Sequence, residues 1–169
     1  RPERLLSLTS MMSTTGEPDV GAPTPEALEA LLTPSPTERA PYIEASSAQG
    51  MIWASRRYGD RARLEALAGE SYDRCFYPDG VSRQLAAILA TGSRAAGLRA
   101  LTVPTLVIHG RDDTLIAPSG GERTAELIPG ARLMLVDDMG HDRPEPLWPL
   151  LTEAILEHTA AVPGSLTHP

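Results

Sequence analysis

Two apolar runs stand out in the second half of the chain, and a helical pattern follows each of them. Residues 103–109 (VPTLVIH) are rich in β-branched side chains, which is typical of a strand buried on both faces of a parallel sheet. Residues 131–136 (ARLMLV) predict another buried strand, whereas residues 121–128 and 146–160 place apolar side chains at helical spacing. This alternation predicts an α/β fold with a parallel sheet and right-handed crossovers.

The first hundred residues contain one further strand pattern and then become helical. Residues 4–12 (RLLSLTSMM) predict a buried strand, and a loop rich in Gly and Pro follows at residues 13–25. Thr24 is placed to cap a helix that has Pro25 at its first position. Helices are expected at residues 25–32, 38–55, 60–76 and 81–91, with a turn at residues 77–80 between the last two.

Charge and cysteine content narrow the classes of protein to consider. The net charge is −7, and every one of the 15 positive side chains is Arg, so no basic face for nucleic acid is expected. The single cysteine, Cys75, cannot form an internal disulfide, and we expect it to be buried and unreactive. No apolar run approaches the roughly 20 residues of a membrane span. These features favour a cytoplasmic protein with neither nucleic acid nor membrane as a partner.

Candidate chemistry follows the two strands of the second half. Residues 109–113 (HGRDD) and 137–142 (DDMGHD) come directly after those strands, and ligands of parallel α/β sheets bind outside the carboxyl ends of strands. A carboxylate in the first loop, Asp112 or Asp113, could orient the imidazole of His141. The free imidazole nitrogen would then act as a general base. His109 is expected to support the first loop.

These segments resemble the last two strand-loop units of the α/β-hydrolase superfamily. The resemblance rests on VPTLVIHGRDDTLIAP and IPGARLMLVDDMGHD, because this family takes its acid from Gly-x-x-Asp after a strand and its base from a later Gly-His. It implies that Asp113 is the acid and His141 the base. LTSMMSTTGEP, ESYDRCFYPDGVSRQLAAILATGSR and the GHD ending resemble the esterase branch that includes aclacinomycin methylesterase.

The resemblance implies a serine-type ester hydrolase with a helical cap and no metal or organic cofactor. Residues 1–16 would hold a core strand, 17–100 the cap and a return helix, 101–162 two strand-helix units, and 163–169 a tail. The family's Gly-x-Ser-x-Gly motif is absent from these 169 residues, so the serine would come from an N-terminal half of the same hydrolase. A small-molecule ester, such as a polyketide-like methyl ester, is the expected substrate.

Five large apolar side chains are candidates for an apolar substrate pocket between the cap and the sheet, although they are equally compatible with the core. These are Met11, Met12, Trp53, Tyr72 and Phe76.

Two alternatives remain open. His109, Asp112, Asp113 and His141 include the residue types of a metal centre with two histidines and a carboxylate, although the usual metal-binding spacings are absent. The other alternative is a non-catalytic binding protein that keeps the hydrolase fold.

Overall fold

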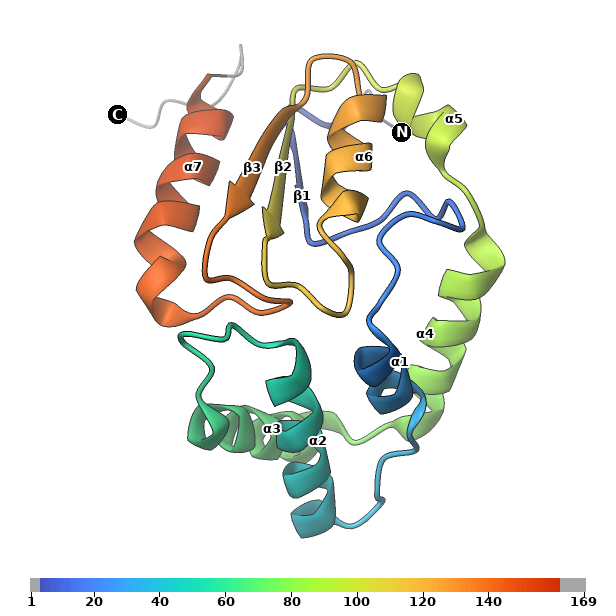
Figure 1. Ribbon diagram of the computed structural model, residues 1–169, viewed down its shortest axis with the longest axis vertical. Helices are drawn as coiled ribbons and strands as arrows, with labels where there is room; N and C mark the ends of the chain where they lie inside the picture. The colour runs from blue at the N-terminus through green and yellow to red at the C-terminus, as the bar shows by residue number, and fades with distance from the viewer. Residues whose placement is uncertain (1–3, 162–169) are drawn as a thin grey trace.

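The computed structural model describes residues 4–161, and a parallel three-stranded sheet lies at its centre (Figure 1). The strands are β1 (Leu8–Met11), β2 (Thr105–Gly110) and β3 (Arg132–Val136), in the order β1-β2-β3. Leu8 pairs with Thr105 at one side of β2, and Leu106 pairs with Arg132 at the other. The predicted parallel α/β arrangement is therefore present.

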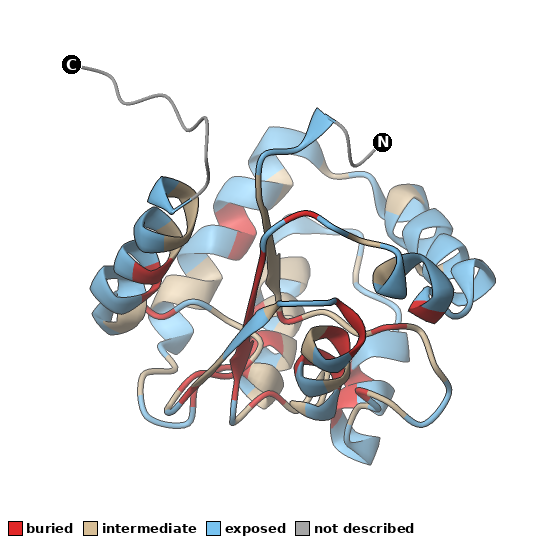
Figure 2. Ribbon diagram, turned by 90° about the horizontal axis from the view of Figure 1, so that it is seen from above, coloured by how far each residue is buried: buried red, intermediate tan, exposed pale blue. Residues whose placement is uncertain are grey.

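Strand β2 is buried along its whole length, as its apolar run predicts (Figure 2). Leu106 and Ile108 point to one face, where they pack in a core cluster with Leu151 of helix α7 (Trp148–Ala160). Side chains alternate along a strand, so His109 points to the other face. There it lies against Gly121 of helix α6 (Ser119–Leu127). The two helices therefore cover opposite faces of the sheet.

The outer strands differ from the prediction in length and burial. Strand β1 begins at Leu8 rather than at residue 4, because its ladder starts with Leu8 N–H donating to Pro104 O. Pro104 has no N–H with which to extend the ladder backwards. Strand β3 is exposed at Arg132 and Leu133, because it pairs with β2 alone within the described residues.

The helices between β1 and β2 follow the predicted order. They are α1 (Pro25–Leu32), α2 (Arg39–Trp53), α3 (Arg61–Cys75), α4 (Pro78–Thr91) and α5 (Ala95–Arg99). The predicted cap of α1 is present, because Thr24 Oγ1 accepts a hydrogen bond from Ala27 N at 3.2 Å. The predicted turn at residues 77–80 is wrong, because Pro78 opens α4. Cys75 is exposed at the end of α3 rather than buried.

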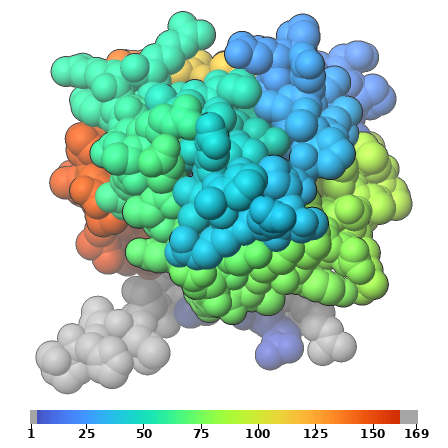
Figure 3. All heavy atoms as spheres, turned by 90° about the horizontal axis from the view of Figure 1, so that it is seen from below, coloured from blue at the N-terminus to red at the C-terminus, as the bar shows by residue number. Residues whose placement is uncertain are grey.

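Helices α1 to α4, which we call the cap, lie beyond the carboxyl ends of the strands (Figures 1 and 3). Helices α2 and α3 pack against each other over most of their length. A short helix, η2 (Glu145–Leu147), leads from the loop after β3 into α7. In residues 4–161, no helix is long and apolar enough to cross a membrane. The predicted tail at residues 163–169 lies outside the described part.

Candidate active site

The turn after β2 fixes the carboxylate of Asp113. Its side chain is fully buried, and its Oδ1 accepts hydrogen bonds from Leu115 N at 2.9 Å and Ile116 N at 2.8 Å. A carboxylate held by two backbone donors has one orientation. The other oxygen, Oδ2, therefore faces the loop that follows β3.

His141 in that loop meets Asp113. Its Nδ1 lies 2.8 Å from Asp113 Oδ2, and the imidazole is 27% exposed. An ionised carboxylate accepts hydrogen bonds only, so Nδ1 carries the proton and Nε2 is left with a free lone pair. The structure thus brings the predicted acid and base together. Asp112, the other candidate acid, is partly exposed and contributes its backbone N–H to Met139 O at 2.9 Å.

The surroundings of Asp113 keep its carboxyl group ionised. Burial by itself would raise the pKa of Asp113, but hydrogen bonds from His109, His141 and Ile116 N outweigh burial and lower it. The net lowered pKa means that a negative charge is present near neutral pH. That charge can stabilise His141 once the imidazole takes up a proton.

His109 lies beneath the same carboxylate. It is completely buried, with Nε2 2.8 Å from Ile116 O and 3.4 Å from Asp113 Oδ2. Its ring fills the space that a side chain at residue 121 would need, since a Cβ atom on Gly121 would lie 2.6 Å from Nδ1. Support of the first loop, expected from the sequence, is consistent with this position.

Two glycines allow the loops to touch through their backbones. A Cβ atom at Gly110 would lie 2.2 Å from Met139 O, and one at Gly140 would lie 2.3 Å from Trp53 O. Real Cβ atoms do not approach a backbone oxygen so closely. Gly110 therefore allows the loop that carries Asp113 (residues 111–118, the acid loop) to contact the loop that carries His141 (residues 137–144, the base loop). Gly140 allows the base loop to contact the end of α2.

The end of α2 is a part of the site that sequence reasoning missed. His141 N–H donates to Trp53 O at 2.6 Å, and Thr114 Oγ1 donates to Ile52 O at 2.9 Å. Ser55 N–H donates to Asp142 Oδ1 at 3.0 Å. All three of these hydrogen bonds involve a backbone atom, which carries no sequence signal. The sequence signals that remain are Gly140 before His141 and the carboxylate of Asp142 after it.

The five candidate pocket residues do not form one group. Met12 is buried in the core cluster, and Met11 packs against it. Tyr72 and Phe76 stack with ring centroids 4.5 Å apart, and Tyr42 completes this aromatic cluster between α2 and α3. Trp53 contributes its carbonyl oxygen to the base loop. A role of these side chains in substrate binding stays a prediction.

A cavity of about 720 Å³ borders the base loop. His141 and Asp142 line it together with Tyr58, Leu64 and Leu67 from the cap. Arg63 of α3 forms an ion pair with Glu145. The guanidinium carbon of Arg63 also lies 5.4 Å from the centroid of the Trp148 ring.

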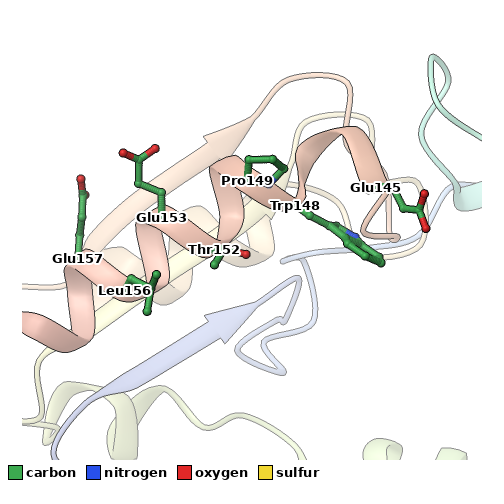
Figure 4. A pocket seen from close by; sticks show the side chains of 7 residues that line it. All are labelled: Glu145, Trp148, Pro149, Thr152, Glu153, Leu156 and Glu157. Atoms are coloured by element: carbon green, nitrogen blue, oxygen red, sulfur yellow. The ribbon is translucent and has the colours of Figure 1, made fainter. Parts of the chain in front are cut away.

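A second hollow, of about 730 Å³, runs along α7 away from His141 (Figure 4). Figure 4 shows the carboxylates of Glu153 and Glu157 on one side of the helix and Leu156 on another. Its lining includes neither Asp113 nor His141, whereas His141 lines the first cavity.

The arrangement of possible metal ligands does not favour the alternative of a metal centre. Both oxygens of Asp113 are occupied by hydrogen bonds, two of them from backbone N–H groups. Among residues 4–161, no group of three or more His, Cys, Asp or Glu side chains is placed to hold a metal ion.

An acidic side chain after one parallel strand contacts a histidine after the next at the sheet's carboxyl edge, which is the arrangement predicted for the acid and base of a hydrolase. Comparison with known proteins agrees, because residues 2–143 match the model of the alpha/beta hydrolase fold family. The chain belongs to the α/β-hydrolase fold family, and the resemblance found in the sequence is confirmed.

The chain is similar to two curated relatives of the expected esterase branch. Rhodomycin D methylesterase DauP of Streptomyces sp. (strain C5) and rhodomycin D methylesterase DnrP of Streptomyces peucetius are each 27% identical over 186 residues. The match covers 95% of this chain and 60% of each relative, so the chain spans less than two thirds of their length.

A solved structure shares the fold. The meta-cleavage product hydrolase CumD of Pseudomonas fluorescens IP01 is 25% identical, with a TM-score of 0.63. That match covers 91% of this chain and 55% of CumD.

Proposed function

We propose that this chain supplies the acid, Asp113, and the base, His141, of a serine-type ester hydrolase. The observation that carries the proposal is the 2.8 Å contact between His141 Nδ1 and a buried Asp113 Oδ2. This contact fixes the imidazole tautomer and leaves Nε2 as the proton acceptor. No step of the mechanism requires a metal or organic cofactor.

In the proposed reaction, a serine hydroxyl attacks the ester carbonyl while Nε2 of His141 takes its proton. The imidazolium, stabilised by Asp113, then protonates the departing alkoxide, which leaves as the alcohol. Water attacks the acyl-serine in the second half of the cycle, with His141 again accepting a proton. The carboxylic acid leaves and the serine hydroxyl is restored.

The serine and the oxyanion hole would come from a segment outside these 169 residues that carries Gly-x-Ser-x-Gly. The greater length of the curated relatives supports this proposal. Strand β1 also pairs with β2 alone within the described residues, which leaves an edge for another strand. Exposed apolar side chains suit further packing, for example Leu6, Val81, Leu89 and Leu156.

The substrate class we propose is a hydrophobic carboxylic ester, with methyl esters of polyketide-like acids as the first to test. The similarity to two rhodomycin D methylesterases supports this class. The cavity beside His141, with Leu64 and Leu67 in its lining, offers an apolar wall for such a molecule.

The test begins with the intact mass of everything that copurifies with this chain, followed by sequencing of each polypeptide. We expect Gly-x-Ser-x-Gly either upstream in the same polypeptide or in a partner. The preparation should release acid from hydrophobic methyl esters and lose that activity in His141→Gln. A folded species without this motif that hydrolyses no ester would overturn the proposal.

A further inference from the structure

The loop that carries His141 is fastened to the cap as well as to the sheet. The His141 N–H donates to Trp53 O at 2.6 Å, at the last residue of α2. The acid loop reaches the same helix end, because Thr114 Oγ1 donates to Ile52 O at 2.9 Å. One short segment of the cap, residues 52–55, therefore contacts both catalytic loops.

The side chain of Asp142 completes this attachment. Its Oδ1 accepts hydrogen bonds from Ser55 N at 3.0 Å and from Gly140 N at 3.2 Å. Ser55 belongs to the cap segment, and Gly140 is the residue just before His141. A single oxygen atom thus holds together the backbones on either side of the contact.

The contact leaves little room for adjustment. Ala54 and Ser55 are buried, and Gly140 approaches the Trp53 carbonyl so closely that a Cβ atom there would collide with it. Removal of the Asp142 carboxylate would leave the buried Ser55 N–H without its acceptor, which is costly in a low-dielectric environment. The loop would then move to expose that group to water, and His141 would move with it.

We propose that Asp142 is a positioning residue for His141: its Oδ1 ties Gly140 to Ser55, so that the imidazole stays against Asp113. The catalytic consequence rests on the proposed function, whereas the geometric consequence does not. Asp142 touches no reacting atom in this scheme. It acts through the placement of the neighbouring histidine.

The experiment compares Asp142→Ala with Asp142→Asn in the complete polypeptide that carries this chain. Asn keeps a carbonyl oxygen that can accept both hydrogen bonds, whereas Ala keeps none. Arg57→Gln is the matched control, because it breaks the exposed Arg57–Asp138 ion pair, which also joins the cap to this loop. The readouts are kcat and KM for a hydrophobic methyl ester, the melting temperature, and the downfield NMR resonance of the His141 Nδ1 proton.

We expect Asp142→Ala to lower kcat by about 10²-fold with little change in KM, the cost of a misplaced catalytic group. The His141 proton resonance should weaken or disappear in the same variant. Asp142→Asn should restore both readouts to near the parent values, and Arg57→Gln should leave both unchanged.

Three results would overturn the proposal. Asp142→Ala could keep kcat within about twofold of the parent, or Asp142→Asn could be as damaging as Asp142→Ala. The third is a loss of kcat and melting temperature with the His141 resonance intact, which would assign Asp142 to general fold support. If the parent hydrolyses no ester, the resonance still decides the role of Asp142, and the proposed function fails separately.

Discussion

Replacement of Asp113 by Asn probes the acid without changing the shape of the side chain. In the structure Oδ1 accepts from two backbone N–H groups, those of Leu115 and Ile116, and Oδ2 faces His141 Nδ1 at 2.8 Å. The Asn oxygen should take the position of Oδ1, because the opposite rotamer points an NH₂ group at two N–H donors. The amide nitrogen then faces His141.

The consequence is a change of tautomer. An NH₂ group donates to Nδ1, so the imidazole proton moves to Nε2, and the nitrogen that should accept the serine proton no longer can. Turning the amide round would leave two backbone donors unpaired, at about 1–3 kcal/mol each. We therefore expect kcat to fall by about 10⁴-fold, equivalent to about 5.5 kcal/mol in the activation barrier.

The assay is steady-state hydrolysis of a hydrophobic methyl ester by the complete protein, with Asp112→Asn as the matched control. Asp112 makes its contact to Met139 through the backbone, which Asn leaves in place. We expect Asp112→Asn to stay within about tenfold of the parent. A loss of less than about tenfold for Asp113→Asn, or a larger loss for Asp112→Asn, would refute the assignment of the acid.

Three further predictions concern the packing and the charge of the site. Gly140→Ala, whose Cβ would lie 2.3 Å from the carbonyl oxygen at the end of α2, should lower both activity and melting temperature. Gly97→Ala, at a position in α5 with open space around it, should leave activity unchanged and should not lower the melting temperature. Ile108→Ala in the fully buried β2 should lower the free energy of unfolding in urea by about 2–5 kcal/mol, and Leu133→Ala at an exposed position should lower it less. Because the folded-state pKa of Asp113 is lowered, its stabilising contribution should be present above about pH 4 and be lost as pH falls through the folded pKa. Urea unfolding of the parent and Asp113→Asn at about pH 6 and pH 3 would check this, and a stability difference that grows on acidification would contradict it.

The sequence predicts the parallel sheet and the two loops of the site because both depend on local pattern. An uninterrupted apolar run marks β2, and strands of this kind end where the ligand-binding loops begin. The family motif favours Asp113 over Asp112, and the structure places Asp113 against His141. The start of β1 could not be predicted from local sequence, because it depends on Pro104, a sheet partner that lies far along the chain.

The contacts made by the end of α2 could not be predicted for a different reason. Trp53 and Ile52 contact the loops of His141 and Asp113 through carbonyl oxygens, which every residue type possesses. Two of the aromatic side chains considered for substrate binding, Tyr72 and Phe76, stack on each other. Composition identifies which side chains are apolar, but tertiary packing decides whether they face a ligand or each other.

The proposed function requires that His141 activates the serine of a Gly-x-Ser-x-Gly motif that lies outside these 169 residues. Mass spectrometry of the complete protein after treatment with a fluorophosphonate tests it most directly, in the parent and in His141→Gln. We predict one covalent adduct, on the serine of a Gly-x-Ser-x-Gly motif, that forms at least about 10³-fold more slowly in His141→Gln. An adduct that forms equally fast without His141, or no adduct in a folded and complete protein, would contradict it.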